Sequence, residues 1–289
     1  MSADHLSPAM GSLFLVATPI GNLEDVTHRA LRVLGEADIV AAEDTRHTRR
    51  LLDHYGLSAR LVSLFEHNER AQIPRMIREL EAGHSVAVVT DAGSPALSDP
   101  GFPLVRAAVA AGIKVVSIPG PSAIVAALQV SGLPTDAFTF AGFLPVKSGA
   151  RRRKLEELSQ RTETIVAFES PHRIDACLEA LEAVWGERPI ALARELTKIH
   201  EEFATGTPEE LLKRFETPHG EFTVLIPPES PSDRTAEAIA DEDVLVLFGQ
   251  ITEFGEFASK REVAREVGER LGLTAKQVYE IVERNKLVE

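Results

Sequence analysis

Residues 85–118 read SVAVVTDAGSPALSDPGFPLVRAAVAAGIKVVSI. The first of them, Ser85–Thr90, are apolar and β-branched, which is typical of a buried strand. A segment rich in Gly and Pro follows, then an apolar helix over Pro103–Ala111 and a second strand over Lys114–Ile118. A strand, a helix and a strand at this spacing predict one β-α-β unit with parallel strands.

The same alternation extends on both sides of this unit, and each predicted strand is followed by a predicted helix. The further strands are Ser12–Thr18, Asp38–Ala42 and Arg60–Leu64. The further helices are Asp25–Leu34, Thr45–Tyr55, Arg70–Glu81 and Ser122–Val130. Residues 12–132 are therefore predicted to form an α/β domain around a mainly parallel sheet.

The pattern changes after Leu133–Asp136, which we interpret as a hinge. Short strands then recur with fewer helices between them, which predicts a second α/β domain with a mixed sheet. The strands are expected over Phe138–Phe143, Thr164–Phe168, Ile190–Arg194, Glu202–Thr205 and Phe222–Ile226. The helices are expected over Arg152–Ser159, Arg173–Val184 and Pro208–Phe215.

A segment rich in Pro and Ser then predicts a linker. Beyond it, helical spacing over Glu242–Gly255, Ser259–Leu271 and Thr274–Glu283 predicts three helices, the last two joined as in a helix-turn-helix module. Thr274 is expected to cap the last helix. We therefore divide the chain into a loose tail (1–11), two consecutive α/β domains (12–132 and 133–228), a linker (229–240) and a small helical module (241–289).

Composition limits the classes of function. The chain has 289 residues and a net charge of −13, which argues against a protein that coats nucleic acid non-specifically, because such proteins present a broad basic surface. Cys177 is the single cysteine, so the sequence excludes an intrachain disulfide and a multi-cysteine metal site. We expect it to be a buried thiol on a helix face. A cytoplasmic location is expected, because no apolar run has the length of a membrane span and the first ten residues lack secretory-signal features.

Three loops at the carboxyl ends of predicted strands are candidate binding sites, because ligands of open α/β sheets bind there. We call them the first loop (Thr18–Asn22), the second loop (Thr90–Gly101) and the third loop (Ile118–Ala123). Their Gly and Pro residues let a ligand approach the main chain closely, although the same residues also make ordinary tight turns. None of the loops matches a dinucleotide-binding or P-loop motif.

Six segments together resemble one family closely. They are Val16–Thr27 (VATPIGNLEDVT), Glu43–Arg46 (EDTR), Val89–Pro95 (VTDAGSP), Ile118–Ala123 (IPGPSA), Phe168–Arg173 (FESPHR) and Ala193–Lys198 (ARELTK). The family is ribosomal RNA small subunit methyltransferase I, within the tetrapyrrole methylases, which are class III S-adenosylmethionine-dependent methyltransferases. The resemblance spans about residues 13–227, and the helical module is similar to that family's C-terminal extension.

The resemblance implies 2′-O-ribose methylation of a cytidine in 16S rRNA near the decoding centre, either in free rRNA or in the assembled small ribosomal subunit. It also implies S-adenosylmethionine as methyl donor, no metal and a homodimer. The implied cofactor contacts are Pro19, Gly21, Ala92, Gly93, Ser94, Leu97, Ser122, Ala123, Phe168, Glu169 and Leu196. The first and second loops depart from those of relatives that methylate tetrapyrroles, which favours the RNA branch.

A ribose hydroxyl is a weak nucleophile near neutral pH, so we expect a base to accept its proton. The leading candidates are Glu43, Asp44, Asp99 and Lys198, with Asp91, Glu169, His172 and Glu195 also open. A lysine would serve only if its pKa were lowered. Structural roles are the alternative: Asp44 could pair with Arg46, Asp99 could cap a turn, and the sequence does not choose among them.

Two basic clusters are candidates for contact with RNA phosphates. The first holds Arg46, Arg49 and Arg50, and the second holds Arg151, Arg152, Arg153 and Lys154, after a predicted mobile loop at Lys147–Gly149. Solvated helix faces are the alternative of equal weight. In the helical module, basic residues alternate with glutamates, so rRNA contact and packing against the rest of the chain both stay open.

Two other functions have weaker support. The first is methylation of a tetrapyrrole or another small molecule within the same superfamily, which would require neither the helical module nor the basic clusters. The second is a DNA-binding regulator, which the helical module alone suggests. The net charge and the enzyme-like domains argue against it.

Overall fold

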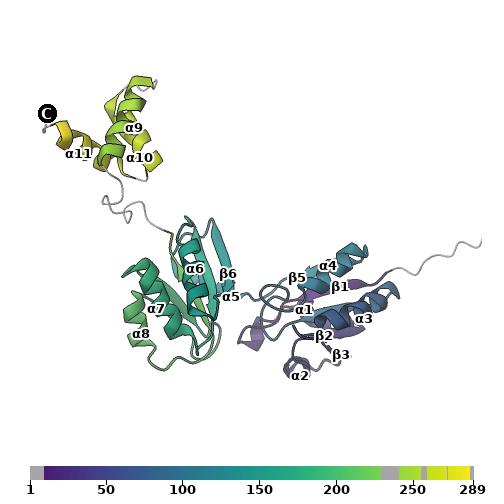
Figure 1. Ribbon diagram of the computed structural model, residues 1–289. Helices are drawn as coiled ribbons and strands as arrows, with labels where there is room; N and C mark the ends of the chain where they lie inside the picture. Colours follow the sequence, from purple (N-terminus) through teal and green to yellow (C-terminus); the bar gives the residue numbers. More distant parts are fainter. Residues whose placement is uncertain (1–9, 229–240, 255–258, 272, 287–289) are drawn as a thin grey trace, which may run out of the picture. The chain divides into compact units, whose positions relative to one another are not determined.

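The computed structural model describes residues 10–228, 241–254, 259–271 and 273–286. They form two units: a body, which extends to Pro227 apart from residues 161–163, and a second unit that holds the C-terminal helices (Figure 1). Of the predicted tail, only residues 10 and 11 are described, and the predicted linker lies outside the described residues.

A five-stranded sheet organises the first α/β domain of the body. Its strand order is β3-β2-β4-β1-β5, and every neighbouring pair is parallel, which confirms the prediction. The strands are β1 (Ser12–Val16), β2 (Ile39–Ala42), β3 (Leu61–Ser63), β4 (Val86–Val89) and β5 (Lys114–Ile118). The helices are α1 (His28–Glu36), α2 (Thr45–His54), α3 (Glu69–Glu81) and α4 (Phe102–Ala110). The next helix, α5 (Ala123–Ser131), follows β5 but packs against the sheet of the second α/β domain.

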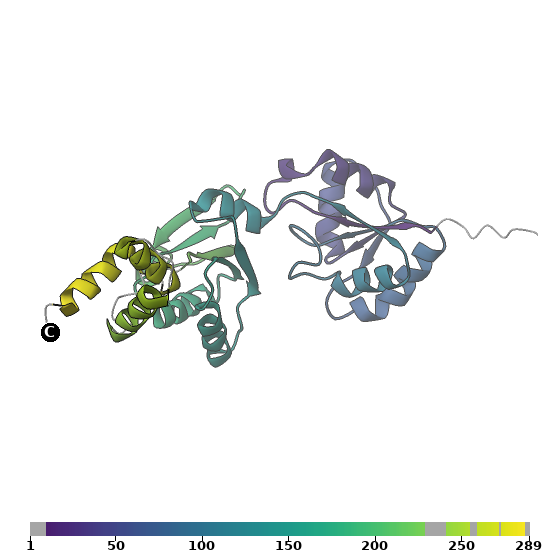
Figure 2. The same cartoon turned by 90° about the horizontal axis from the view of Figure 1, so that it is seen from above.

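Helices cover both faces of this sheet (Figure 2). In β4, Val86 and Val88 pack into a core with side chains of α3 and α4, whereas Ala87 and Val89 pack into a second core with side chains of α1 and α2. Burial on both faces explains why the sequence of β4 is continuously apolar instead of alternating.

The first helix begins later than predicted. A short 3-10 turn, η1 (Leu23–Asp25), comes first, and the side chain of Asn22 accepts a hydrogen bond from the backbone N–H of Glu24. The hydroxyl of Thr27 then accepts from the N–H of Ala30 at 3.1 Å. Such a cap satisfies an N–H that has no partner in the first helical turn, so α1 starts at His28.

The second α/β domain contains the predicted mixed sheet, with strand order β6-β7-β10-β8-β9. Strand β6 is parallel to β7, and the other neighbouring pairs are antiparallel. The strands are β6 (Phe138–Phe143), β7 (Thr164–Glu169), β8 (Ile190–Arg194), β9 (Glu202–Gly206) and β10 (Phe222–Ile226). The helices are α6 (Ser148–Leu158), α7 (Ile174–Trp185) and α8 (Pro208–Arg214).

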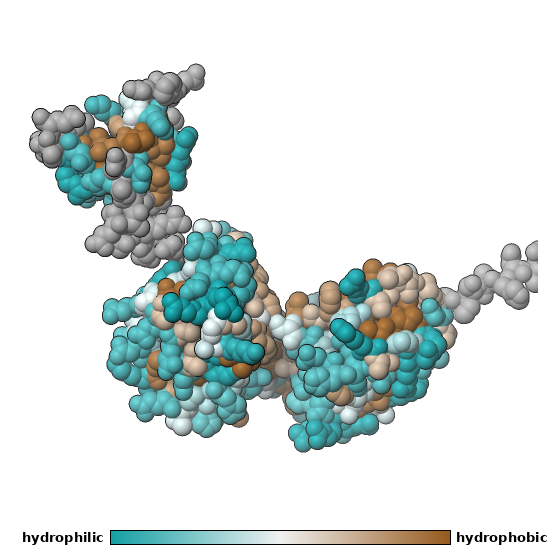
Figure 3. Space-filling model, viewed as in Figure 1, coloured by the Kyte–Doolittle hydropathy of each residue, from teal (hydrophilic) through white to brown (hydrophobic). Residues whose placement is uncertain are grey.

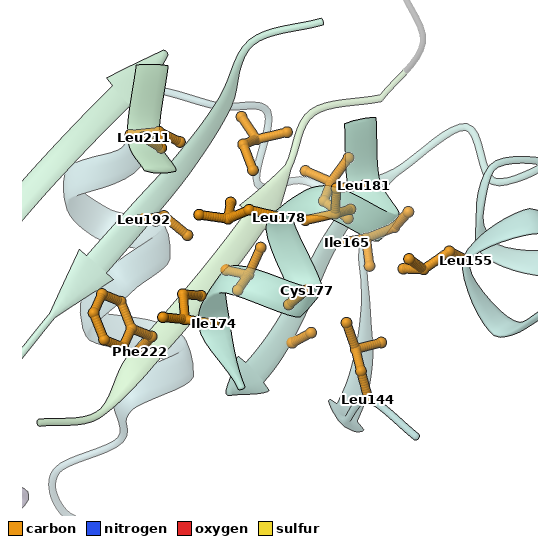
Figure 4. Close-up of a cluster of buried hydrophobic side chains, with 14 of the residues drawn as sticks. Leu144, Leu155, Ile165, Ile174, Cys177, Leu178, Leu181, Leu192, Leu211 and Phe222 are labelled. Atoms are coloured by element: carbon orange, nitrogen blue, oxygen red, sulfur yellow. The ribbon is translucent and has the colours of Figure 1, made fainter. Parts of the chain in front are cut away.

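A single large core joins these helices to the sheet (Figure 4). Cys177 of α7 lies in it beside leucines of α6 and α7 and is fully buried, as the sequence predicts. Burial raises the pKa of its thiol to about 12. The predicted mobile loop at Lys147–Gly149 is wrong, because Ser148 and Gly149 form the first turn of α6.

The second unit consists of α9 (Asp241–Phe254), α10 (Lys260–Leu271) and α11 (Ala275–Lys286), which share one apolar core. Thr274 caps α11 as predicted: its hydroxyl accepts from the N–H of Gln277 at 3.2 Å. The side chain of Gln277 accepts in return from the N–H of Thr274 at 2.8 Å. This reciprocal cap fixes the turn between α10 and α11.

The face seen in Figure 3 is mainly hydrophilic, interrupted by hydrophobic patches. Exposed large apolar side chains include Phe102 and Val109 of α4 and Phe143 of β6. No helix in the described part of the chain is long and apolar enough to cross a membrane.

Candidate functional site

The three candidate loops lie at one edge of the first sheet. Thr18 and Gly93 exchange backbone hydrogen bonds at 2.9 and 3.0 Å, which joins the first loop to the second. The N–H of Ala17 donates to the carbonyl of Ile118 at 3.1 Å, which joins the end of β1 to the third loop. The carboxyl ends of parallel strands therefore bring the loops together, as the sequence predicts.

A cavity of about 490 Å³ opens beside the second and third loops, and residues of the second α/β domain complete its wall. Most of the implied cofactor contacts line this cavity. They are Ala92, Gly93, Ser94, Leu97, Ser122, Ala123, Phe168, Glu169 and Leu196. Pro19 and Gly21 of the first loop are not part of the lining.

The second loop has an uncommon backbone conformation where it borders the cavity. Gly93 has φ +75°, a region that glycine adopts without steric cost. Ala96 and Ser98 have φ +67° and +65°, although neither is glycine. Each such residue costs roughly 1–2 kcal/mol, and strained residues of this kind cluster at functional sites.

Gly21 lies against the turn that follows β8, and residues of this turn line the cavity. A Cβ at this position would stand 2.3 Å from Cγ of Lys198 and 2.9 Å from Oγ1 of Thr197, so a larger residue would displace the turn that follows β8. In that turn, Glu195 and Thr197 have φ +52° and +68°. Gly21 therefore positions the turn, and its implied contact with a cofactor finds no support in the cavity lining.

Glu169, at the end of β7, is buried with one carboxylate oxygen unpaired. The residue is 1% exposed and lines the cavity. Its Oε1 accepts from Nη2 of Arg173 at 2.5 Å and from the N–H of Ser170 at 2.8 Å, whereas its Oε2 has no hydrogen-bond partner. A buried acceptor without a donor is unfavourable, so a ligand that carries an N–H or O–H group suits this position.

Phe143, at the end of β6, forms an apolar wall that the sequence reasoning missed. The register between β6 and β7 shifts between Phe140 and Phe143, and Gly142 at this bulge has φ +65°. The ring of Phe143 lies 5.7 Å from the ring of Phe168, and the residue is 52% exposed and lines the cavity. A glycine inside a predicted strand was the available signal, because it marks a bulge that redirects the next side chain.

Six carboxylate residues line the cavity, and four of them interact electrostatically: Asp99 with Glu43, Asp91 and Glu221. Burial is the largest cause that raises the pKa of Asp99, and the negative charges of the other three add to it. The result is a pKa of about 7, although a hydrogen bond from Thr90 acts in the opposite direction. A carboxylate with a pKa near the working pH suits a proton acceptor. No group of His, Cys, Asp or Glu among the described residues is arranged to hold a metal ion.

Lys198 is less suitable as the base. Nζ of Lys198 lies 2.7 Å from Oε1 of Glu195 and 3.2 Å from Oε2 of Glu221. Burial lowers the pKa of Lys198, but these two partners outweigh it and leave the pKa raised, which keeps the ammonium protonated. Glu43 stays a second candidate for the base, because burial raises its pKa as it raises that of Asp99. Its Oε2 accepts from the N–H of Asp91 at 3.3 Å.

Asp44 takes the structural role that the sequence left open. Its carboxylate caps α2 by accepting from the N–H of Arg46 at 2.8 Å and pairs with Nη2 of Arg46 at 2.8 Å. The hydrogen bond from the Arg46 side chain holds the pKa of Asp44 below its ordinary value, and Asp44 does not line the cavity. His172 is exposed and also lies outside the lining.

The second basic cluster divides into a buried arginine and three solvated residues. Arg151 is 5% exposed, and its Nε and Nη2 donate to the carbonyls of Pro145 and Val146, each at 3.1 Å. The predicted phosphate contact of Arg151 is therefore wrong in this structure, because its donors already hold a backbone loop. Arg152 pairs with Glu156 and Lys154 pairs with Glu157, each at 2.9 Å.

Three predicted RNA contacts remain exposed without such a partner. In the part of the chain that the structure describes, no carboxylate lies within ion-pair distance of Arg49, Arg50 or Arg153. Arg46 of the first cluster is engaged by Asp44. The basic surface available to phosphates is therefore smaller than the sequence suggests.

Comparison with known proteins places both α/β domains in one group of enzymes. The family model of the tetrapyrrole (corrin/porphyrin) methylases matches residues 12–212. Ribosomal RNA small subunit methyltransferase I of Mesorhizobium japonicum is 51% identical over 244 residues, which are 83% of this chain and 82% of that protein. The protein of the same name from Synechocystis sp. is 41% identical over 278 residues, which are 94% of this chain and 97% of that protein.

A solved structure is also similar. The uroporphyrin-III-C-methyltransferase of Thermus thermophilus has a TM-score of 0.53 and 26% identity, and the match covers 74% of this chain and 94% of that one. The similarity thus extends to the arrangement of the strands and helices.

Proposed function

Because the chain belongs to the tetrapyrrole methylase family and, within it, to the ribosomal RNA small subunit methyltransferase I proteins, we propose that it transfers a methyl group from S-adenosylmethionine to small-subunit ribosomal RNA. The acceptor is the 2′-hydroxyl of a cytidine in 16S rRNA near the decoding centre. The enzyme acts in the cytoplasm as a homodimer and without a metal. The cavity carries this proposal, because its lining combines most of the implied cofactor contacts with Asp99.

The cavity suits S-adenosylmethionine in size and chemistry. Its volume of about 490 Å³ falls within the range of small-molecule sites. Phe168 and Leu196 offer apolar surface for the adenine, and the unpaired Oε2 of Glu169 can accept from a hydroxyl or amino group of the adenosine. Ser122 precedes α5 and makes no capping bond through its side chain, so the first N–H groups of this helix are available to the carboxylate.

Methyl transfer to a hydroxyl is a displacement at carbon, for which the bound cofactor supplies the electrophilic methyl group. The hydroxyl oxygen bonds to the methyl carbon while the carbon–sulfur bond breaks, and its electron pair neutralises the positive charge on sulfur. Asp99 accepts the proton that leaves the hydroxyl. The products are the methyl ether, S-adenosylhomocysteine and a protonated Asp99.

A tritium-transfer assay tests the function. Labelled S-adenosylmethionine and the enzyme are offered to unmethylated small ribosomal subunits, naked 16S rRNA, duplex DNA and a tetrapyrrole precursor. We expect label in a ribose of small-subunit rRNA. Label in the tetrapyrrole alone would instead establish the alternative function, methylation of a tetrapyrrole. The similarity to the uroporphyrin-III-C-methyltransferase of Thermus thermophilus is the reason to include this substrate. Sedimentation of the same preparation tests the dimer.

The basic clusters give a prediction for salt dependence. We expect the double variant Arg49→Ala/Arg50→Ala to bind small subunits more weakly and to lower the slope of log affinity against log salt by roughly 1.5, since each phosphate contact adds about 0.7 to 0.9. The variant Arg153→Ala should lower it by about half as much. Filter binding across a salt series measures both.

The matched control is Arg152→Ala, on the same helix as Arg153. Because Arg152 is paired with Glu156, its removal should change the slope less than removal of Arg153. If the wild type, the double variant and Arg153→Ala gave equal slopes of log affinity against log salt, these arginines would not contact RNA phosphates.

A further inference from the structure

We propose that Phe143 is the platform on which the base of the target nucleotide stacks while its ribose is methylated. This inference rests on the proposed function and adds the substrate side of the same cavity. A ribose hydroxyl inside a folded RNA reaches a cofactor cavity only if its nucleotide leaves the neighbouring stack, and extruded bases stack on aromatic side chains. Phe143 is an exposed aromatic residue in the cavity wall.

The side chain of Phe143 is partly covered and partly exposed. Phe168 packs against its ring at 5.7 Å, and the guanidinium of Arg173 lies 5.9 Å from the centre of that ring. The rest of the side chain is open, which leaves Phe143 52% exposed. Exposure of a large apolar side chain to water is unfavourable, and a ligand that covers it removes this cost. Phe143 therefore offers a surface for a flat, partly apolar ligand such as a nucleobase.

Two arginines hold this platform in place through the backbone that follows it. Nη1 of Arg173 donates to the carbonyl of Leu144 at 3.4 Å. Arg151 donates to the next two carbonyls, as described above. This explains why an arginine that the sequence assigned to RNA phosphates is buried: it acts on the RNA site indirectly, by fixing the loop that carries Phe143.

The platform adjoins the proton acceptor. A Cβ on Gly142 would stand 3.1 Å from Oγ of Ser98, so the bulge that precedes Phe143 lies next to the residue that precedes Asp99. A nucleotide whose base lies on Phe143 therefore has its sugar on the side of the cavity that carries Asp99 and the second loop. Phe143 is exposed and Glu169 is buried, so the arrangement assigns the base to the exposed side of the cavity and the adenosine of the cofactor to the buried side, beside Phe168 and Glu169.

Kinetics of variants test the platform. We expect Phe143→Ala to lower kcat/KM for unmethylated small subunits by about 10- to 100-fold, as loss of one base stack does elsewhere. The affinity for S-adenosylhomocysteine, measured by calorimetry, should not change. Phe143→Tyr should restore the activity and Phe143→Leu should not, because only the former keeps a π face. The matched control is Phe138→Ala, since Phe138 is also exposed on β6 but does not line the cavity.

A binding measurement separates this inference from the proposed function. Trp185 is the single tryptophan, so the variant Phe143→Trp/Trp185→Phe has one tryptophan, at the platform, whose emission can be excited selectively over that of the two tyrosines. Naked 16S rRNA, which contains no tryptophan, should quench its emission, and S-adenosylhomocysteine alone should not. Quenching by S-adenosylhomocysteine, or equal losses of cofactor affinity and kcat/KM in Phe143→Ala, would move Phe143 to the cofactor site and overturn the inference. Failure of the wild type to methylate rRNA would overturn the proposed function and this inference with it.

Discussion

Replacement of Asp99 by asparagine is expected to slow methyl transfer by about 10²- to 10⁴-fold, which is the usual contribution of a positioned base. Asparagine keeps the shape of the side chain but cannot take the proton from the ribose hydroxyl. The affinity for S-adenosylhomocysteine should change little, because the base acts on the acceptor. Single-turnover transfer of labelled methyl groups and calorimetry measure the two quantities.

The pH dependence of the wild type gives the same test without a mutation. With the pKa of Asp99 raised to about 7, kcat/KM should rise as the pH increases to 7 and then level off, because only the ionised carboxylate accepts a proton. Glu221→Gln should move this rise to lower pH, since the charge of Glu221 contributes to the raised pKa. A rise that persists unchanged in Asp99→Asn would assign it to another group.

The raised pKa of Asp99 also makes the stability of the fold depend on pH. Folding favours the protonated form of Asp99, whose pKa in the unfolded chain is about 3.9. Its stabilising contribution is therefore complete below that value and is lost as the pH rises through about 7. Asp99→Asn should accordingly raise Tm relative to the wild type at pH 8 more than at pH 5.

Replacement of Gly93 by valine is expected to abolish measurable binding of S-adenosylhomocysteine while the fold survives. Gly93 has φ +75°, where a β-branched residue is strongly disfavoured, and its N–H and carbonyl join the first and second loops. A Cβ at this position would lie 3.6 Å from Ile20, which is an ordinary contact distance, so there is space for a side chain. The strain comes from the backbone conformation instead. Calorimetry measures the affinity, and circular dichroism measures the fold.

The control for this variant is Gly112→Val. Gly112 has φ +71°, and a Cβ there would meet nothing within 4 Å, so the variant carries similar backbone strain away from the cavity. We expect it to lose stability and to keep its affinity. If Gly93→Val bound S-adenosylhomocysteine as tightly as Gly112→Val does, the second loop would not be the cofactor site.

Local patterns in the sequence were sufficient for most of the fold. The β-branched run at Val86–Val89 and the glycines and prolines after it predicted β4, the second loop and α4. The three loops lie at one edge of the sheet because the carboxyl ends of parallel strands all point to the same edge, whatever the order of the strands. The order β3-β2-β4-β1-β5 was not predictable, since it depends on which helix faces pack on the sheet.

The residues that were misjudged in the site have roles set by tertiary contacts. Arg151 looks like its exposed neighbours in sequence, and only the carbonyls of Pro145 and Val146 show why it is buried. Lys198 is a candidate base from the sequence, but Glu195 and Glu221 lie beside its ammonium in the fold and keep it protonated. Among several acidic candidates, Asp99 could not be singled out, because its pKa depends on charges brought together from distant segments.

The strained residues on both sides of the cavity have a thermodynamic consequence. Ala96, Ser98, Glu195 and Thr197 hold positive φ values, at roughly 1–2 kcal/mol each. This cost is carried by the folding free energy, which is only about 5–15 kcal/mol for a typical domain. The walls are thus preorganised, so a ligand loses little affinity to the ordering of loops when it binds. The fold is therefore less stable than it would be without these strained residues, and the cavity binds its ligand with a smaller ordering cost.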